Sequence, residues 1–180
     1  MQGKIFLSGG GDEKKSFFID ELFTHSVKNI LYIPLAWTSD NEYKNCLKWF
    51  KKCMAQHKFS NITMLTDLNK KIDLNKFSAI YIGGGNSFKL LKLFRSSGFD
   101  KKLISFNKNG GIVYGGSAGA IILGKNISTS RLCKFPDNNE VNLKDLNGLD
   151  LIFNNDLQCH FEENQLNEHI NYVKKIKEIL

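Results

Sequence analysis

The sequence predicts an α/β fold, with a doubly wound, mainly parallel sheet and helices on both faces. Short apolar runs rich in isoleucine, leucine, valine and tyrosine recur along the 180 residues, and each is followed by glycine or a polar turn. Segments with a helical pattern of apolar residues lie between these runs. This alternation is typical of βαβ units and a parallel sheet. Because no fixed repeat and no low-complexity linker divides the chain, we expect a single domain over residues 1–180.

Five apolar runs are the expected strands. They are Lys4–Ser8, Asn29–Leu35, Ile62–Thr66, Ala79–Ile82 and Gly111–Tyr114. The expected helices between them are Lys15–Ser26, Asn41–His57, Asn86–Ser96 and Phe99–Asn107. In the second of these helices the apolar side chains recur at intervals of three and four residues, which predicts one apolar stripe.

The pattern loosens after Gly119. We expect Ala120–Lys125 to continue as a helix, whereas Asn126–Asn147 is polar, is broken by Pro136 and is expected to form a long loop. The rest of the chain is expected to contain a turn of hairpin type and a last helix. The expected elements are the apolar runs Leu149–Phe153 and Leu157–Phe161, joined by Asn154-Asn155-Asp156, and the helix Gln165–Leu180.

Composition argues against several classes of protein. No segment approaches 18 consecutive apolar residues, so we expect a soluble, cytoplasmic protein without a membrane partner. The net charge is +7, but the lysines are spread over helical segments, which favours solvated helix faces over a nucleic-acid surface. Free thiols are expected rather than a zinc site or a disulfide framework, because no C-x-x-C pair occurs among Cys46, Cys53, Cys133 and Cys159.

The first candidate for chemistry is a serine between glycines. Gly115–Gly119 reads G-G-S-A-G and matches G-x-S-x-G, with an expected strand before it and a helix after it. In such a turn the small neighbours allow a close backbone approach, and the Oγ of Ser117 projects into the cleft beyond the carboxyl end of the sheet. The N–H of Ala118 would point at a developing oxyanion. A phosphate-binding glycine turn is the alternative.

A second glycine cluster, Gly83–Asn86, also follows a strand. The carboxyl ends of neighbouring parallel strands lie side by side, so this loop can supply a second backbone donor to the oxyanion, which we assign to Gly85. The other members of the two glycine loops that we expect to contact the substrate are Gly84, Asn86 and Gly116.

His160 is the expected general base for a serine nucleophile. It closes the apolar run Leu157–Phe161, as a base held at a strand end would. The other three histidines lie in expected helices, where surface roles are ordinary; they are His25, His57 and His169.

The acid that fixes the imidazole tautomer is expected in the loop between Ser117 and His160. This loop offers Asp137, Glu140 and Asp145, of which Asp145 resembles a turn residue before Leu146-Asn147-Gly148. The choice between Asp137 and Glu140 stays open at this point.

Together these residues resemble the peptidase S51 group, which includes dipeptidase E and the cyanophycinases. The matching elements span roughly residues 4 to 165 in the expected order; they are Gly83–Asn86, Gly115–Ala120, Gly148–Leu151 and the pair His160-Phe161. The resemblance implies a fold akin to class I glutamine amidotransferases, with serine in place of cysteine. It also implies that Ser117 is the nucleophile and His160 the base, with Gly85 and Ala118 as oxyanion donors. By similarity to dipeptidase E the acid is Asp137, whereas similarity to the cyanophycinases keeps Glu140.

The chain departs from dipeptidase E after the histidine. Dipeptidase E recognises an N-terminal aspartate through basic residues there, whereas Glu162 and Glu163 follow His160-Phe161 in this chain. An acidic pair would repel an aspartyl side chain, so we expect a different or looser substrate preference. The chain also stops where family members continue, so a short or truncated form is expected.

The expected function is hydrolysis of short peptides through an acyl-enzyme, with no metal and no organic cofactor. The alternatives are an esterase or amidase with the same triad and a non-catalytic module that binds an anionic metabolite. Trp37 and Trp49 are expected to be packing residues, although the loop Ala36–Asn41 follows a strand end and could line the cleft.

Overall fold

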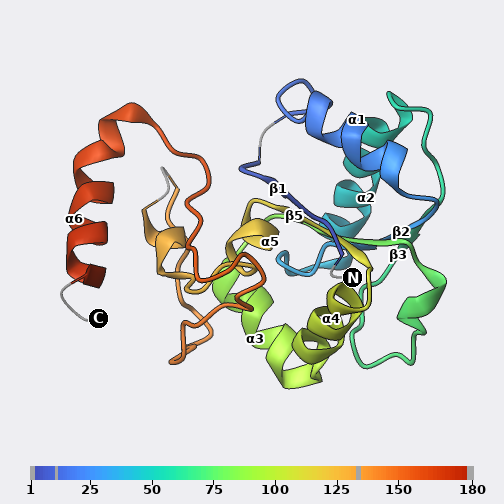
Figure 1. Ribbon diagram of the computed structural model, residues 1–180. Helices are drawn as coiled ribbons and strands as arrows, with labels where there is room; N and C mark the ends of the chain where they lie inside the picture. Colours follow the sequence, from blue (N-terminus) through green and yellow to red (C-terminus); the bar gives the residue numbers. More distant parts are fainter. Residues whose placement is uncertain (1–2, 11, 133–134, 178–180) are drawn as a thin grey trace.

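The computed structural model describes residues 3–10, 12–132 and 135–177, with side chains through residue 174. Five parallel strands form one sheet in the order β1-β5-β4-β2-β3 (Figure 1). The strands are β1 (Ile5–Ser8), β2 (Ile30–Ile33), β3 (Ile62–Met64), β4 (Ala79–Ile82) and β5 (Ile112–Gly116). All five expected strands are confirmed, although β2 and β3 end two residues earlier and β5 ends two residues later than expected.

Four helices cover the two faces of the sheet, which confirms the doubly wound α/β prediction (Figure 1). The helices α1 (Phe17–Ser26) and α2 (Asp40–Ala55) lie on one face. The helices α3 (Ser87–Ser97) and α4 (Phe99–Lys108) lie on the other face. The short helix α5 (Ala118–Ile121) follows β5 and packs against α3.

Local hydrogen bonds explain where the helices next to the site begin. Ser39 and Glu42 form a capping box at the start of α2, in which the Ser39 side chain accepts from the Glu42 N–H and the Glu42 carboxylate accepts from the Ser39 N–H. At α3, the Asn86 side chain accepts from the Lys89 N–H at 2.9 Å. Each cap directly follows the loop at the carboxyl end of a strand, so both helices start beside that end of the sheet.

The two faces of the sheet carry different strand side chains. Because successive strand residues point to opposite faces, β2, β4 and β5 place Tyr32, Tyr81 and Tyr114 in register on the side of α1 and α2. We call this side the tyrosine face; the rings of Tyr81 and Tyr114 stack with centroids 4.3 Å apart. The other side, here the aliphatic face, is covered by α3, α4 and α5, and its strand residues are Leu31, Ile33, Ile80, Ile82 and Val113.

The prediction of a hairpin formed by Leu149–Phe153 and Leu157–Phe161 is wrong. Neither run is a strand; the first forms turns whose N–H groups donate to the chain around α5, for example Leu149 to the Ile122 carbonyl and Leu151 to the Leu123 carbonyl, both at 2.8 Å. Leu149 and Leu151 are buried in the core of the aliphatic face. The apolar pattern therefore reports burial of an irregular segment.

Two expected helices differ in extent. Helix α5 ends at Ile121 instead of Lys125, and the chain then turns. The last helix, α6 (Leu166–Lys177), begins after a short 3₁₀ turn, Glu163–Gln165, and the final residues 178–180 of the expected helix lie outside the described residues. The described residues of the expected long loop 126–147 are irregular apart from a 3₁₀ turn at Ser128–Arg131 and an isolated antiparallel bridge between Asn126 and Asn147.

Candidate active site

Ser117 occupies a strained turn between β5 and α5. Its φ of 51° and ψ of −116° lie outside the regions that residues with a side chain ordinarily adopt. The turn is held by the Ser117 N–H, which donates to the Ser8 carbonyl at 2.9 Å. A methyl group on Gly119 would lie 2.2 Å from the Ile82 carbonyl oxygen, so only glycine lets α5 pack this closely against β4. The turn thus joins a strand to a helix, which is the local context that the sequence predicts for Ser117.

The side chain of His160 meets that of Ser117. The Ser117 Oγ lies 3.0 Å from His160 Nε2, within hydrogen-bond distance. His160 does not close a strand as expected; it lies in an irregular segment and has a φ of 52°. The preceding Cys159 is buried, and its Sγ contacts the Ser117 carbonyl at 3.5 Å. This contact holds the histidine segment against the serine turn.

The second glycine loop lies beside Ser117. A methyl group on Gly84 would come within 3.0 Å of the Ser117 Cβ. Gly85 has a φ of +133°, and a side chain there would also collide with the carbonyl of Ala36 at 2.6 Å, so the loop conformation requires glycine. Within the described part of the chain, the N–H groups of Gly85 and Ala118 donate to no protein acceptor, and both residues line one small cavity with Ser117.

Of the two open acid candidates, Asp137 lies near His160. Asp137 lines the small cavity with Ser117 and His160, and its carboxylate accepts from the Ser87 N–H, at the start of α3, at 2.8 Å. Burial raises the pKa of the Asp137 carboxyl, whereas the hydrogen bonds from Ser87 and the nearby charge of His160 oppose that rise. Glu140 is exposed and lines a different cavity with Lys89 and other residues of α3.

The loop that carries Asp137 is fastened along α3. The Asn86 side chain donates to the Asn138 carbonyl, and the Lys92 ammonium donates to the Val141 carbonyl, both at 2.8 Å. Arg95 binds further along the loop and forms an ion pair with Asp145 at 3.2 Å. As the sequence suggests, Asp145 is a turn residue, since its carboxylate accepts from the Asn147 N–H.

Ser117 and His160 line two cavities. The small cavity has a volume of about 180 Å³ and lies toward α5 and Asp137. The larger cavity, of about 370 Å³, lies on the tyrosine face and reaches Tyr32, Tyr81 and helix α2. Gly84, Gly85 and Gly116 line the larger cavity, whereas Asn86 lies in the wall of the cavity that contains Glu140.

The sequence reasoning missed parts of the larger cavity. Trp37 and Trp49 do not serve purely as packing residues; they are 43% and 37% exposed and line this cavity. Gly10 also lines it, and a methyl group on Gly10 would lie 2.6 Å from His160 Cε1. The sequence could have pointed to Gly10, because a run of glycines follows the first expected strand just as Gly83–Gly85 follows the fourth. Trp37 lies in the loop Ala36–Asn41, which the sequence places after a strand end, whereas Trp49 gave no comparable signal.

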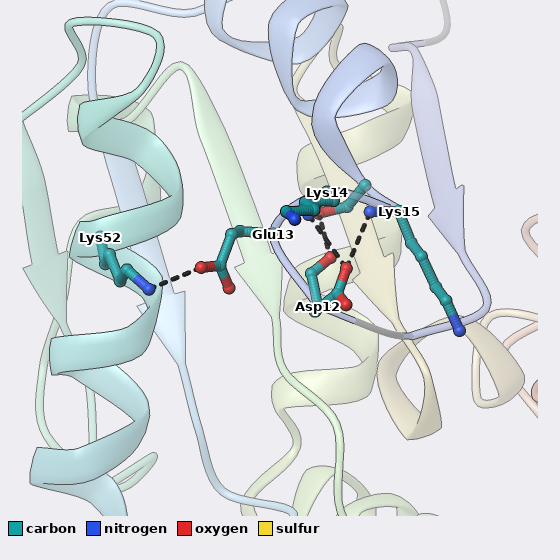
Figure 2. Close-up of polar contacts among 6 residues, drawn as sticks. Asp12, Glu13, Lys14, Lys15 and Lys52 are labelled. Atoms are coloured by element: carbon teal, nitrogen blue, oxygen red, sulfur yellow. Dashed lines mark hydrogen bonds and ion pairs between the residues drawn. The ribbon is translucent and has the colours of Figure 1, made fainter.

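The loop that follows β1 forms one wall of the larger cavity and is tied to α2, which forms another. The carboxylate of Asp12 accepts from the N–H groups of Lys14 and Lys15, both at 3.0 Å (Figure 2). Glu13 forms an ion pair with Lys52 of α2 at 2.5 Å (Figure 2). These contacts connect residues 12–15 to α2.

The remaining features that bear on function are metal sites, cysteines and membrane-spanning helices. They contain no group of three or more histidine, cysteine, aspartate or glutamate side chains arranged to hold a metal ion. Cys46 and Cys53 are free thiols, and Cys133 lies outside the described residues. In the part of the chain that the structure describes, no helix has the length and apolar character needed to cross a bilayer.

Comparison with known proteins identifies a family and structural relatives of this chain. The model of peptidase family S51 matches residues 5–178. No match was found among curated proteins. A crystal structure of a candidate peptidase E protein from Listeria monocytogenes EGD-e is similar, with a TM-score of 0.72 and 24% identity over 95% of this chain and 88% of that chain. A peptidase from an acI-B1 actinobacterium has a TM-score of 0.68 and 19% identity, covering 94% and 72% of the two chains. At these identities the two structures support the fold.

Proposed function

Because this chain belongs to peptidase family S51, a family of serine peptidases, we propose that it hydrolyses short peptides with Ser117 as the nucleophile. The observation that carries the proposal is the 3.0 Å approach of Ser117 Oγ to His160 Nε2 at a strained strand-to-helix turn. A hydroxyl is a weak nucleophile by itself, and an adjacent imidazole that takes its proton is the usual means of activation.

In the proposed mechanism, His160 Nε2 removes the Ser117 proton as Oγ attacks the scissile carbonyl. The N–H groups of Gly85 and Ala118 are the proposed oxyanion donors, supported by their lack of a protein acceptor in the described structure and by their position in the small cavity. His160 then donates its proton to the leaving amine, and water releases the acyl group by the same route.

We assign Asp137 as the acid that orients His160. Its position in the small cavity and the effect of the His160 charge on its pKa support this assignment over Glu140. One carboxylate oxygen is bound to the Ser87 N–H. The other oxygen is the acceptor that we assign to the imidazole Nδ1–H.

The test is hydrolysis of a dipeptide library by the wild-type protein and by Ser117→Ala, with free amino acids followed by mass spectrometry. We expect kcat/KM to fall by at least about 10³-fold in the variant, because the covalent route is lost. The matched control is Ser60→Ala, at an exposed serine outside the cavities, and it should keep wild-type activity. Undiminished hydrolysis by Ser117→Ala would refute the mechanism, and cleavage of aryl esters without cleavage of peptides would replace the peptidase with an esterase.

A further inference from the structure

The larger cavity is adjacent to the reacting groups and has room for a side chain of the substrate. Ser117, His160 and Gly85 line it, so a substrate whose carbonyl lies at Ser117 extends directly into it. Its volume of about 370 Å³ is more than twice the roughly 150 Å³ of an apolar cavity that binds benzene. An aromatic ring and part of its backbone therefore fit.

The wall of this cavity carries no charge that could pair with a charged substrate. None of the described residues that line it is aspartate, glutamate, lysine or arginine, and His160 is engaged with Ser117. A carboxylate or ammonium that enters such a site loses its hydration without gaining a partner, which costs several kcal/mol.

Charged groups near the cavity are bound elsewhere. The Lys89 ammonium donates to the Trp37 carbonyl and lies in the wall of a different cavity. Lys52 is paired with Glu13. Hydrogen bonds from Thr38 and Ser39 at the start of α2 lower the pKa of the Glu42 carboxyl to about 2, so this group remains a carboxylate held in its cap.

Four aromatic side chains line the cavity, beside the small polar side chains of Ser8, Ser16 and Asn45. Tyr32 and Tyr81 form the floor at the carboxyl ends of β2 and β4, whereas Trp37 and Trp49 approach from the loop after β2 and from α2. Aromatic rings stack on one another and bury large apolar areas, so they favour an aromatic or large aliphatic partner. Glu162 and Glu163, which the sequence suggested would repel an aspartyl substrate, line neither cavity that contains Ser117.

We propose that the larger cavity binds an uncharged aromatic or large aliphatic side chain of the substrate, so that the preferred substrates are apolar peptides and not aspartyl peptides. This inference rests on the proposed peptidase function, because it concerns the side chain of a peptide substrate. The selectivity comes from the described lining residues, which include four aromatic rings and neither lysine nor arginine.

The test compares Phe-containing with Asp-containing dipeptides, each residue being placed in turn at the first and second positions. In the wild type, kcat/KM should favour Phe over Asp by at least about 100-fold at one of the two positions. Asn45→Lys adds a cation to the wall and should reduce this ratio by at least about 10-fold. Gln56→Lys makes the same change of charge at the C-terminal end of α2, eleven residues or about 16 Å along the helix from Asn45 and outside the lining residues, and should leave the ratio within about 2-fold of wild type.

A binding measurement separates failure of this inference from failure of the proposed function. Calorimetry on Ser117→Ala reports dipeptide affinity without hydrolysis. Tighter binding of Phe dipeptides, weakened selectively by Trp49→Ala, would support the cavity assignment even if the wild type cleaves no peptide. Preference for Asp, equal ratios in Asn45→Lys and Gln56→Lys, or no dipeptide binding at all would overturn it.

Discussion

The two faces of the sheet differ in how they are closed. On the aliphatic face, α3, α4 and α5 cover the strands with fully buried residues such as Phe88, Leu91 and Phe94. On the tyrosine face, α1 and α2 cover the middle of the strands, but the carboxyl end opens into the larger cavity beside Trp37 and Trp49. The difference teaches that the aliphatic face is closed by buried side chains, whereas the open end of the tyrosine face is where we propose that the substrate is selected.

The largest expected effect is a difference in the free energy of unfolding between a substitution on the aliphatic face and one at the open end of the tyrosine face. Phe94→Ala removes a ring that is 0% exposed and contacts Phe99, so it should lower the free energy of unfolding by about 3–5 kcal/mol. Trp49→Ala removes a larger but partly exposed ring and should cost about 1 kcal/mol or less. Urea denaturation of both variants measures the difference. Equal losses would mean that the tyrosine face is also a stability element at its open end.

A smaller effect on stability is expected from substitutions of Ser117, in the turn between β5 and α5. The backbone strain at this residue should be relieved by glycine but not by alanine, because only glycine adopts a φ of 51° with this ψ at low cost. We therefore expect Ser117→Gly to be more stable than Ser117→Ala by about 1 kcal/mol, the reverse of the order at ordinary positions. Thermal denaturation of the two inactive variants tests this order. A more stable alanine variant would argue against stored strain.

The smallest effect concerns a buried carboxylate on the tyrosine face. Asp20 accepts hydrogen bonds from Ser16 and Tyr114 at 2.7 and 2.8 Å, and burial raises its pKa above the ordinary value of 3.8. A raised pKa means that the folded state binds the proton more tightly than the unfolded chain. This contribution to stability is therefore complete below pH 3.8 and is lost as the pH rises through the pKa of the folded state.

The nearly isosteric Asp20→Asn variant removes this titration. Its free energy of unfolding should vary less with pH than that of wild type over this acidic range, and peptide hydrolysis at neutral pH should change little. Denaturant titrations at several pH values check the slope. An unchanged slope would show that Asp20 does not titrate differently on folding.

The fold could be predicted from the sequence to a large extent because buried parallel strands give nearly continuous apolar runs. All five strands followed from these runs, and the glycine pattern around Ser117 pointed to the turn. The same rule failed at Leu149 and Leu151, which are buried while their N–H groups donate to an irregular segment. Hydrophobicity indicates that a segment is inside, but it does not identify the partner of its backbone.

In the candidate site, the pair Ser117 and His160 could be predicted from the sequence, whereas the acid could not. Ser117 and His160 stand out by residue type and local context, and the structure brings them together. The choice between Asp137 and Glu140 depends on how a loop of irregular conformation lies along α3, which Lys92, Arg95 and Asn86 determine through contacts about 50 residues distant in sequence. Such contacts leave no periodic pattern in the sequence.

The placement of Trp37 and Trp49 allows binding in the larger cavity to be followed by intrinsic tryptophan fluorescence. These are the only two tryptophans in the chain, and both line the larger cavity. Indole emission depends on the polarity and mobility of its surroundings, so a side chain that displaces water from this cavity will change the intensity or wavelength of essentially all the tryptophan fluorescence. No indole elsewhere in the chain dilutes that signal. Occupancy of the cavity can therefore be followed in real time on unlabelled protein, before any bond in the bound molecule is broken.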